Sequence, residues 1–489
     1  MLFNSHIFML LFLPLLLAGW YFLNWKKKFQ LAQGYLIGMS LWFYAYANLQ
    51  YLWLLLFSCL IGWLLSCLPE KIFSEKGKKV LTGVGCVFHL GLLGYFKYSN
   101  FFLENLNTVF HTDFPMLQIL LPVGISFYTF QQLAYLIDRC RGDAPRDSFF
   151  DYLTFMVYFP QLLQGPILLR SEFMGQLKEP ERRRFHAERF SEGIQFFVFG
   201  LAKKVLLADT LAKAVNYGYS NVSMLDSISA LLLAVGYLTE LYFDFSGYCD
   251  MAVGLGKMIG LEVAENFDAP FHSASVKEFW RRWHMTLGRF FTRYVYIPLG
   301  GNRRGKMRTL CNVMIVMLLS GLWHGAAWTF VLWGFLHGVG MIWDNLEHPH
   351  LPKKWMRQAA TFAYVCMTFV FFRAESIAQG VDVLKSIVSL KWNGFVFQMA
   401  SALDLTEFYM ITKALSMKLP GLLSWFWLGI FVVLIAICFR VLSGKKVSGV
   451  VALQKQKGYG RLYPVLLAFL FTWSMISMTG VSEYLYFSF

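Results

Sequence analysis

The sequence predicts an all-α, polytopic integral membrane protein, and three observations carry this prediction. Hydrophobic residues make up 57% of the chain and charged residues 15%, whereas a typical soluble domain carries about 25% charged residues. The apolar residues form long blocks, many of them near the ~20 residues that a helix needs to cross a bilayer. Lys and Arg lie in short clusters between the blocks, as in the cytoplasmic loops of membrane proteins. A soluble enzyme, a disordered chain and a coiled coil are therefore excluded, and the net charge of +15 does not indicate nucleic-acid binding.

The first five apolar blocks predict the orientation of the chain in the membrane. They cover residues 7–23, 31–46, 49–68, 80–95 and 117–137. Basic segments follow the first, third and fifth blocks, at 26–28, 71–79 and 139–146. Because cytoplasmic loops carry the excess of Lys and Arg, this alternation predicts an extracytoplasmic N-terminus. The first block lacks the positive start and the small-residue cleavage site of a signal peptide, so we interpret it as a membrane span.

The regular alternation ends at residues 149–169, which predict a re-entrant segment. This block is apolar but contains an acidic residue, two glutamines and two prolines, namely Asp151, Pro160, Gln161, Gln164 and Pro166. Basic segments flank it on both sides, the second being the long run at 170–189. A segment between two cytoplasmic loops must enter the membrane and return, which irregular backbone tolerates only where protein or water satisfies its amides. We therefore expect a cavity open to the cytoplasm here.

The later apolar blocks complete a single helical membrane domain. They cover residues 190–201, 228–243, 310–319, 323–343, 359–372, 422–442 and 465–478. At ~20 residues per span, the chain is expected to form about eleven to thirteen spanning or re-entrant helices. We expect one domain over 1–489, with a core at roughly 115–375 and peripheral helices at 1–114 and 376–489. The eight cysteines show no CxxC spacing, so neither a disulfide framework nor a metal site is predicted.

His324 is the strongest candidate for chemistry. It lies in the run Ser-Gly-Leu-Trp-His-Gly-Ala-Ala-Trp at 320–328, between two apolar blocks. An ionisable residue at membrane depth is costly and indicates function by default. Small neighbouring residues let a helix or a ligand approach closely, and neutral imidazole can accept a proton near pH 7. The alternative is a histidine that only packs helices together, which is the interpretation we favour for His89 and His337.

His284 lies in a run that is both charged and aromatic, Glu-Phe-Trp-Arg-Arg-Trp-His at 278–284. One interpretation is an interfacial helix, with Trp at headgroup depth and Arg on lipid phosphate. The other is the rim of a reaction site, in which Arg281 and Arg282 bind an anionic substrate, Trp283 stacks, and His284 acts with His324. Glu278 lies three and four residues before the arginines, so simple pairing along a helix is also expected.

Asp244 is a candidate for orienting an Arg or a His. It lies six residues before Asp250 near the end of an apolar block. Six positions do not share a helical face, so a paired-carboxylate mechanism is not indicated. No metal-ligand spacing, phosphate-binding glycine loop or serine elbow is present.

Several of these runs, taken together, resemble the membrane-bound O-acyltransferase family. The likeness rests on Glu-Asn-Phe-Asp-Ala-Pro-Phe at 265–271, Phe-Trp-Arg-Arg-Trp-His at 279–284, Tyr-Ile-Pro-Leu-Gly-Gly-Asn-Arg at 296–303 and Trp-His-Gly at 323–325. Shorter matches lie at 121–127, 159–166, 242–248 and 371–374. The likeness extends over most of the chain, least in 382–419, and is strongest to the bacterial branch typified by the membrane subunit of alginate O-acetylation.

The resemblance implies a fold with a central tunnel and the transfer of an acyl group from a thioester donor to a hydroxyl. It implies His324 and His284 as the catalytic residues, and Trp323, Trp283, Arg281, Arg282, Asp244 and Asn266 as candidates for lining the tunnel or positioning the histidines. His324 would take the proton from the attacking hydroxyl and return it toward the thiolate. His284 would orient the acceptor or stabilise the tetrahedral oxygen.

Donor and acceptor follow from the same resemblance. The donor is expected to be acetyl-CoA or the phosphopantetheine thioester of an acyl carrier protein, used as a substrate rather than as a bound cofactor. The acceptor is expected to be an extracytoplasmic polysaccharide or a partner resembling an acetyltransferase or esterase. The expected location is the bacterial cytoplasmic membrane, with the chain in contact with lipid.

The chain ends in the aromatic run Tyr-Leu-Tyr-Phe-Ser-Phe at 484–489. Aromatic residues at a membrane end normally anchor at the interface. The run also resembles C-terminal motifs of this branch, which makes Tyr486 a candidate acyl relay.

Two alternatives stay open at this point. One is D-alanyl transfer from a carrier-protein thioester to teichoic acid, in which the basic segment at 170–189 docks the carrier by charge. The other, from a different class, is a transporter or acyl-group channel without catalysis. Its function would tolerate His324→Ala, whereas an acyltransferase would lose turnover by orders of magnitude.

Overall fold

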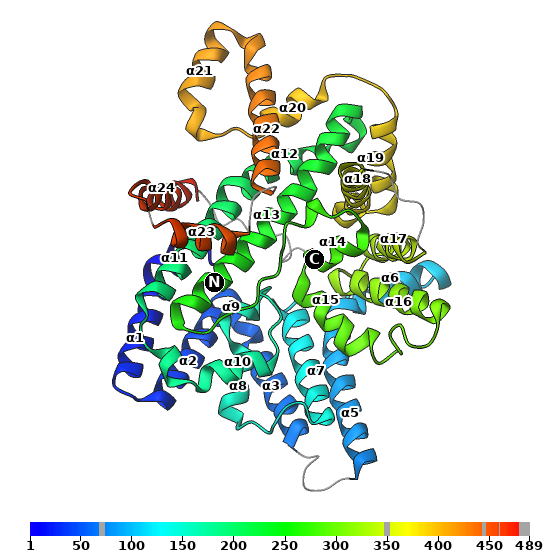
Figure 1. The fold of residues 1–489 in the computed structure, drawn as a ribbon. Helices are drawn as coiled ribbons and strands as arrows, with labels where there is room; N and C mark the ends of the chain where they lie inside the picture. Colours follow the sequence, from blue (N-terminus) through cyan, green and yellow to red (C-terminus); the bar gives the residue numbers. More distant parts are fainter. Residues whose placement is uncertain (68–73, 347–352, 443–445, 459, 479–489) are drawn as a thin grey trace. The chain divides into compact units, whose positions relative to one another are not determined.

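All regular structure in the described part of the chain is helical, which confirms the predicted all-α class (Figure 1). The computed structural model describes residues 1–67, 74–346, 353–442, 446–458 and 460–478. Within these ranges, six helices are long and apolar enough to cross a membrane. They are Phe8–Trp25, Leu49–Cys67, Lys76–Phe110, Ser227–Ile259, Lys306–His324 and Pro420–Phe439. The chain is thus a multi-pass membrane protein. The other helices in the described ranges are shorter or more polar than these six, so the expected number of eleven to thirteen includes helices of that kind.

The chain divides into two compact units, each described here by itself. Unit 1 consists of Met1–Val198, Tyr248–Glu265 and Thr286–Pro298. Unit 2 consists of Phe199–Gly247, Asn266–Met285 and Leu299–Phe489. The predicted site residues that lie within the described ranges all belong to unit 2, which is one compact body.

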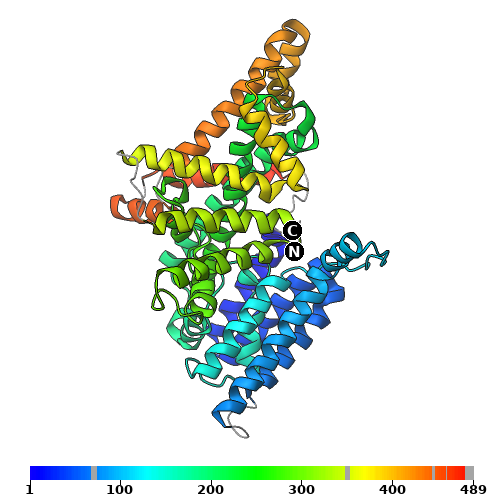
Figure 2. The same cartoon turned by 90° about the vertical axis from the view of Figure 1, so that its right-hand side faces the viewer.

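Unit 1 contains the N-terminal helices. They are α1 (Leu13–Trp25), α2 (Phe29–Asn48), α3 (Leu52–Cys67), α5 (Glu75–Leu93), α6 (Ser99–Phe110), α7 (Ile125–Arg141), α8 (Phe149–Val157), α9 (Phe159–Leu162), α10 (Arg170–Lys178) and most of α11 (Ala187–Ala202). Helix α5 packs along both α3 and α7 (Figure 2). Helix α2 contacts both α1 and α8. Part of the core is a cluster of aromatic rings around Phe43 and Phe159, whose centroids lie 5.4 Å apart.

The segment 149–169 is broken, as its prolines predict. Helix α8 ends at Val157, the short α9 covers Phe159–Leu162, and extended backbone then leads to α10. The side chains from 154 to 169 are buried, and Gln161 donates a hydrogen bond to the carbonyl of Phe155. The backbone therefore passes through protein without a straight span, which fits a segment that does not cross the membrane in one helix.

One predicted boundary in unit 1 is wrong for a local reason. The block at 117–137 was expected to be a single span, but α7 begins only at Ile125. Gly124 before it has φ +78°, and a Cβ there would lie 2.5 Å from the carbonyl oxygen of Leu162. This turn requires glycine, and hydropathy alone does not detect it.

Unit 2 contains the later helices. They are α12 (Asp209–Ser220), the first part of α13 (Ser227–Ile259), α14 (Val276–Arg282), α16 (Lys306–His324), α17 (Trp328–Asn345), α18 (Lys354–Arg373), α19 (Ile377–Val388), α20 (Phe395–Ser401), α21 (Tyr409–Lys418), α22 (Pro420–Leu442), α23 (Val447–Lys457) and α24 (Leu462–Ser477). Helix α15 (Met285–Phe291) begins at Met285, the last residue of the unit 2 segment Asn266–Met285, and its other residues are counted in unit 1.

Helices α16 and α17 form a tight hairpin that sets the position of His324 (Figure 2). A Cβ on Gly321 would lie 2.3 Å from the carbonyl oxygen of Phe330, and one on Gly334 would lie 2.5 Å from that of Met317. The two backbones thus approach as closely as small residues allow. The predicted span at 323–343 is wrong at its start, because Trp323 and His324 end α16 and the chain turns before α17 begins at Trp328.

Candidate active site

His324 is the last residue of α16 and lies in an aromatic cage. It is 3% exposed, so the ring does not face lipid. Its centroid lies 4.9 Å from Trp323, 5.2 Å from Trp333 and 5.0 Å from Phe372. The end of a helix, where carbonyl groups lack intrahelical partners, favours a positive charge nearby. The position therefore suits an imidazole that takes up a proton during a reaction.

His284 lies at the break between α14 and α15, in a backbone conformation rare for residues other than glycine. Its φ is +47°, in the left-handed region that costs a non-glycine residue about 1–3 kcal/mol where the surroundings impose it. The ring is fully buried. Strain of this kind is often found at functional sites.

The hydrogen bonding of His284 defines its tautomer. Its Nδ1 lies 3.3 Å from the Oδ1 of Asn266. A carbonyl oxygen only accepts hydrogen bonds, so Nδ1 carries the proton and Nε2 has the lone pair. Among the described residues, Nε2 is buried and has no hydrogen-bond partner. Burial lowers the pKa of the His284 imidazole to about 3, so the ring is neutral at physiological pH and presents a hydrogen-bond acceptor.

The two histidines meet, although forty positions separate them in the sequence. Their ring centroids lie 6.4 Å apart, and Trp323 lies 5.9 Å from His284. Two rings at this separation can both reach a small polar group, since hydrogen bonds to it need only about 3 Å each. The two rings therefore lie close enough to act on one group, and their joint catalytic role stays a prediction.

The aromatic and amide candidates lie around this pair. Trp283 is buried, 5.1 Å from Phe267 and 5.5 Å from Phe369. Asn266 is buried as well, and besides its contact with His284 its carbonyl accepts the backbone N–H of Met285. These residues hold the strained turn at 283–285 in place, so they position His284.

The arginine candidates lie at the edge of this region. Arg282 pairs with Glu278 at 2.8 Å, as the spacing along the helix predicts, and also donates to the carbonyl of Asp268. Arg281 is exposed. Neither arginine contacts the histidine rings, so an anion-binding role next to His324 gains no support from this geometry.

Asp244 has a different partner from the one expected. We expected it to orient an Arg or a His, but it forms a buried ion pair with Lys204 at 2.6 Å. Lys204 also lies 2.8 Å from Asp209. Sequence reasoning missed Lys204 and the nearby buried Glu240, although both are ionisable residues inside apolar runs, which is the signal that identified His324.

His337 is a structural histidine. The indole N–H of Trp280 donates to its Nδ1 at 3.2 Å, and Thr368 lies 3.0 Å from its Nε2. The Thr368 hydroxyl donates to the carbonyl of Val365, so it accepts from Nε2. Both ring nitrogens are thus satisfied, and the favoured interpretation of this histidine as a packing residue fits the structure.

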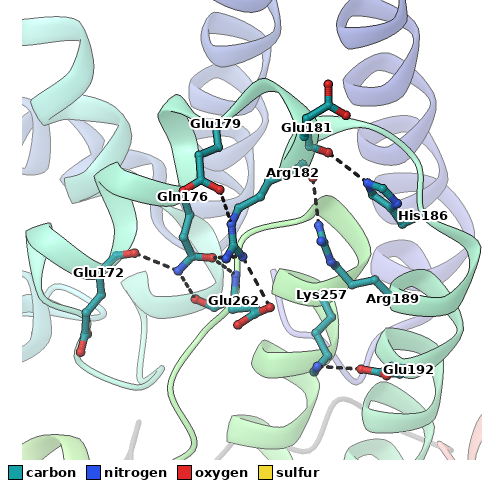
Figure 3. A network of polar contacts seen from close by, with 10 residues as sticks. All are labelled: Glu172, Gln176, Glu179, Glu181, Arg182, His186, Arg189, Glu192, Lys257 and Glu262. Atoms are coloured by element: carbon teal, nitrogen blue, oxygen red, sulfur yellow. Dashed lines mark hydrogen bonds and ion pairs between the residues drawn. The ribbon is translucent and has the colours of Figure 1, made fainter. Parts of the chain in front are cut away.

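The basic segment at 170–189, in unit 1, uses much of its charge internally (Figure 3). Arg182 pairs with Glu179 at 2.8 Å and with Glu262 at 3.5 Å, and Arg189 donates to the carbonyl of Arg182. Lys257 on α13 pairs with Glu192 at 2.9 Å. These contacts join α10, α11 and the end of α13 within the unit, which is an explanation for the charges that needs no docked partner.

The described residues contain no cluster of His, Cys, Asp or Glu that could hold a metal ion. Tyr486 lies outside the described residues, so its relay role stays a prediction. The central tunnel also stays a prediction.

Comparison with known proteins adds a family match. The family model described as the membrane-bound O-acyltransferase family matches residues 141–375, a range that includes both His284 and His324. The chain is 35% identical over 423 residues to the peptidoglycan O-acetyltransferase of Helicobacter pylori, with 80% of each chain covered. It is 39% identical over 389 residues to the probable alginate O-acetylase AlgI of Azotobacter vinelandii, covering 77% of this chain and 76% of that one. Its identity to the teichoic acid D-alanyltransferase of Streptococcus thermophilus is 28% over 253 residues, which covers 49% of this chain and 58% of that one.

Proposed function

Because the chain belongs to the membrane-bound O-acyltransferase family and is an O-acyltransferase, we propose that it uses His324 and His284 to acetylate an extracytoplasmic hydroxyl. The donor is a cytoplasmic thioester, and acetyl-CoA is the first candidate. The acceptor is a cell-envelope polysaccharide, or an esterase-like partner that passes the group on. The observation that carries the proposal is the 6.4 Å separation of the two buried rings.

His324 acts as the proton acceptor. As the acceptor oxygen attacks the thioester carbonyl, its proton moves to the imidazole of His324, and a tetrahedral intermediate forms. When the carbon–sulfur bond breaks, the same proton passes toward the departing thiolate. The C-terminal end of α16 favours the positive charge of the transient imidazolium.

His284 orients the acceptor. Its Nε2 bears a lone pair, and its pKa of about 3 keeps the ring neutral, so it can accept a hydrogen bond from a neighbouring hydroxyl of the acceptor. A neutral Nε2 without a proton cannot donate to an oxyanion. Of the two roles considered for His284, this arrangement supports orientation.

The proposed topology follows from the charge of the helix ends. The positive-inside rule puts the basic clusters on the cytoplasmic side and the N-terminus outside. The donor then reaches His324 from one side and the acceptor from the other, through a tunnel. Tyr486 is a candidate relay, and Tyr486→Phe tests it: acyl transfer that stays intact excludes the relay.

The decisive experiment is transfer of labelled acetyl from acetyl-CoA by the purified protein. We expect His324→Ala to lower the rate by about 10²–10⁴-fold, the usual contribution of a general base. His337→Asn is the matched control, since it also removes a buried imidazole from the hairpin region. It should lower stability but leave the rate within about tenfold. Equal losses in both variants would contradict the role of His324.

D-alanyl transfer to teichoic acid is the second candidate. The observation in its favour is the 28% identity to a D-alanyltransferase, and the smaller coverage ranks it below acetyl transfer. If wild-type protein moved no acetyl from acetyl-CoA but moved D-alanine from a charged carrier protein, this candidate would replace the first. A protein that passes the labelled group across the membrane without ester formation, and does so equally in His324→Ala, would be a channel.

A further inference from the structure

Unit 2 contains a second polar region, separate from the two histidines. It is a cavity of about 840 Å³ between α12, α13, α18 and the start of α17. This volume lies within the range of small-molecule sites, roughly 300–1,000 Å³. Lys204, Asn216, Glu240, Phe330, Phe372 and Arg373 are among its lining residues.

Glu240 is the feature that calls for a ligand. The residue is 2% exposed, and among the described residues its Oε2 is buried without a hydrogen-bond partner. A buried polar atom left without a partner costs about 1–3 kcal/mol. Because Glu240 lines the cavity, a hydroxyl group placed there would supply the missing donor.

Arg373 provides the opposite half of the recognition. Its guanidinium lies 5.0 Å from the ring centroid of Tyr219 and donates to the Oδ1 of Asn216 at 3.1 Å. Within the described ranges it forms no ion pair, and its five N–H donors exceed what one amide oxygen accepts. A hydroxyl both donates and accepts, so a ligand with several hydroxyls can bind Glu240 and Arg373 together.

The charges of the cavity favour a neutral ligand. Three basic and four acidic side chains line it, so the site has almost no net charge. Lys204 is already held by Asp244 at 2.6 Å and by Asp209 at 2.8 Å. A strongly anionic ligand would have to compete with these carboxylates for the ammonium group.

The inner wall of the cavity is also the wall of the catalytic cage. Phe330 and Phe372 line the cavity, their centroids lie 4.9 Å apart, and Phe372 lies 5.0 Å from the ring of His324. The cavity is thus separated from His324 by the ring of Phe372.

A surface groove is formed by segments that lie close to the cavity residues in the chain. This groove has a volume of about 910 Å³ and is lined by residues from 222–225 and 376–393, which begin within two residues of the cavity residues Ser220 and Glu375. Gln379 joins the two regions, because it accepts the N–H of Glu375 at 2.8 Å and donates to the carbonyl of Tyr219 at 3.5 Å. Trp392 in the groove is 56% exposed and offers a flat ring face for stacking on a sugar.

The cavity lies at the helix ends away from the basic clusters. Arg373 ends α18, which begins at Lys354 directly after Lys353. Ala327 and Thr329 lie at the tip of the α16–α17 hairpin, and α16 starts after Arg303 and Arg304. In the proposed orientation, the cavity therefore opens on the extracytoplasmic side.

From these observations we propose that the cavity binds a neutral, hydroxyl-rich sugar unit of the acceptor, with Glu240 hydrogen-bonded to one sugar hydroxyl and Arg373 donating to another. The rest of the glycan chain lies in the groove along Trp392. This assignment deepens the proposed function and rests on it. It means that the membrane enzyme itself selects a glycan acceptor.

Binding of chitotetraose to the purified protein, measured by calorimetry, tests the proposal without turnover. Wild-type protein should bind the probe, and Glu240→Gln and Arg373→Lys should each weaken binding about tenfold, as expected when a buried hydrogen bond is lost. Glu407→Gln is the matched control. Glu407 is exposed and does not line the cavity, so this variant should bind as wild type does.

Three results would overturn the proposal. These are no binding by wild-type protein, equal binding by wild type and both cavity variants, and tighter binding of tetragalacturonate, an anionic chain of the same length. Arg373→Lys keeps the test valid if Glu240→Gln does not fold. Failure of the acyltransferase proposal gives a different result: chitotetraose binds and the variants weaken it, but no acetyl moves to the probe from any donor.

Discussion

Removing Lys204 should destabilise the protein strongly, and by an amount that depends on pH. The Lys204 side chain is 2% exposed and that of Asp244 1% exposed, so water screens neither charge. Removing one partner of such a pair costs about 3–5 kcal/mol, because the other charge stays buried alone. In Lys204→Met, Asp244 can escape this penalty by taking up a proton. For an ordinary carboxyl this costs about 4 kcal/mol at pH 7 but only about 1.5 kcal/mol at pH 5. Asp209, with a side chain 24% exposed, can be solvated and adds less.

We therefore expect Lys204→Met to lose about 3–4 kcal/mol of unfolding free energy at pH 7 and about 1–2 kcal/mol at pH 5. The assay is SDS titration in mixed micelles, followed by tryptophan fluorescence. The control is Lys204→Met/Asp244→Leu, which removes both charges and should recover at least about 2 kcal/mol at pH 7. The reasoning is refuted if the single variant loses less than about 1 kcal/mol at pH 7, if its loss is the same at both pH values, or if the double variant is no more stable than the single one.

Two further predictions use the same titration. Gly321→Ala should lose about 1–3 kcal/mol of unfolding free energy, because its Cβ would lie 2.3 Å from the carbonyl oxygen of Phe330. The control is Gly429→Ala in α22, which has nothing within 4 Å of its Cβ and should gain up to about 1 kcal/mol. Equal effects of the two substitutions would contradict the close packing of α16 on α17. Burial raises the pKa of Asp226, but hydrogen bonds, chiefly from Ser229, outweigh this and hold that pKa below its usual value. A carboxyl whose pKa is lowered in the folded state stabilises that state at pH values above its unfolded pKa of about 3.9, and this stabilisation is lost as the pH falls through the folded pKa. Wild type should therefore be roughly 1 kcal/mol more stable than Asp226→Ala at pH 6, and this advantage should vanish in stronger acid. An advantage of wild type that does not shrink as the pH falls below about 3.9 would refute this.

The class of fold and the two histidines were predictable because both depend on strong local signals. Long apolar blocks and the charges between them predict a multi-pass helical protein whatever the packing. His324 and His284 stand out because an imidazole amid apolar or aromatic residues is unusual. Their approach to 6.4 Å was expected from the family resemblance rather than from spacing, since a separation of forty residues says nothing about distance.

The breaks between helices were not predictable from hydropathy. Apolar residues run through the turn at 325–327 without interruption in composition, so the sequence suggested a span that starts at Trp323. The turn depends on Gly325, whose Cβ would lie 2.0 Å from the ring of Phe330, and no hydropathy average detects such a contact. The cavity was missed for another reason, because Lys204 and Glu240 are isolated charges in apolar runs, and their place around one cavity depends on how residues 203–220 pack against α13.

The backbone at His284 is the place where local stability and chemistry disagree. Glycine or asparagine is the residue that a left-handed turn favours, yet the chain has a histidine at φ +47°. The strain of about 1–3 kcal/mol is therefore not explained by the turn itself. It is explained if the imidazole has a task that glycine cannot perform. The bond from Nδ1 to Asn266 leaves Nε2 buried with its lone pair unused, an arrangement that costs stability and yields nothing to the resting fold. A second buried imidazole, that of His324, lies 6.4 Å away. A hydroxyl-bearing substrate between the two rings would donate a hydrogen bond to Nε2 of His284 and give up its reacting proton to His324. The conflict at this one residue thus supports the proposal that His284 takes part in catalysis, and this support does not depend on which hydroxyl or which thioester the enzyme uses.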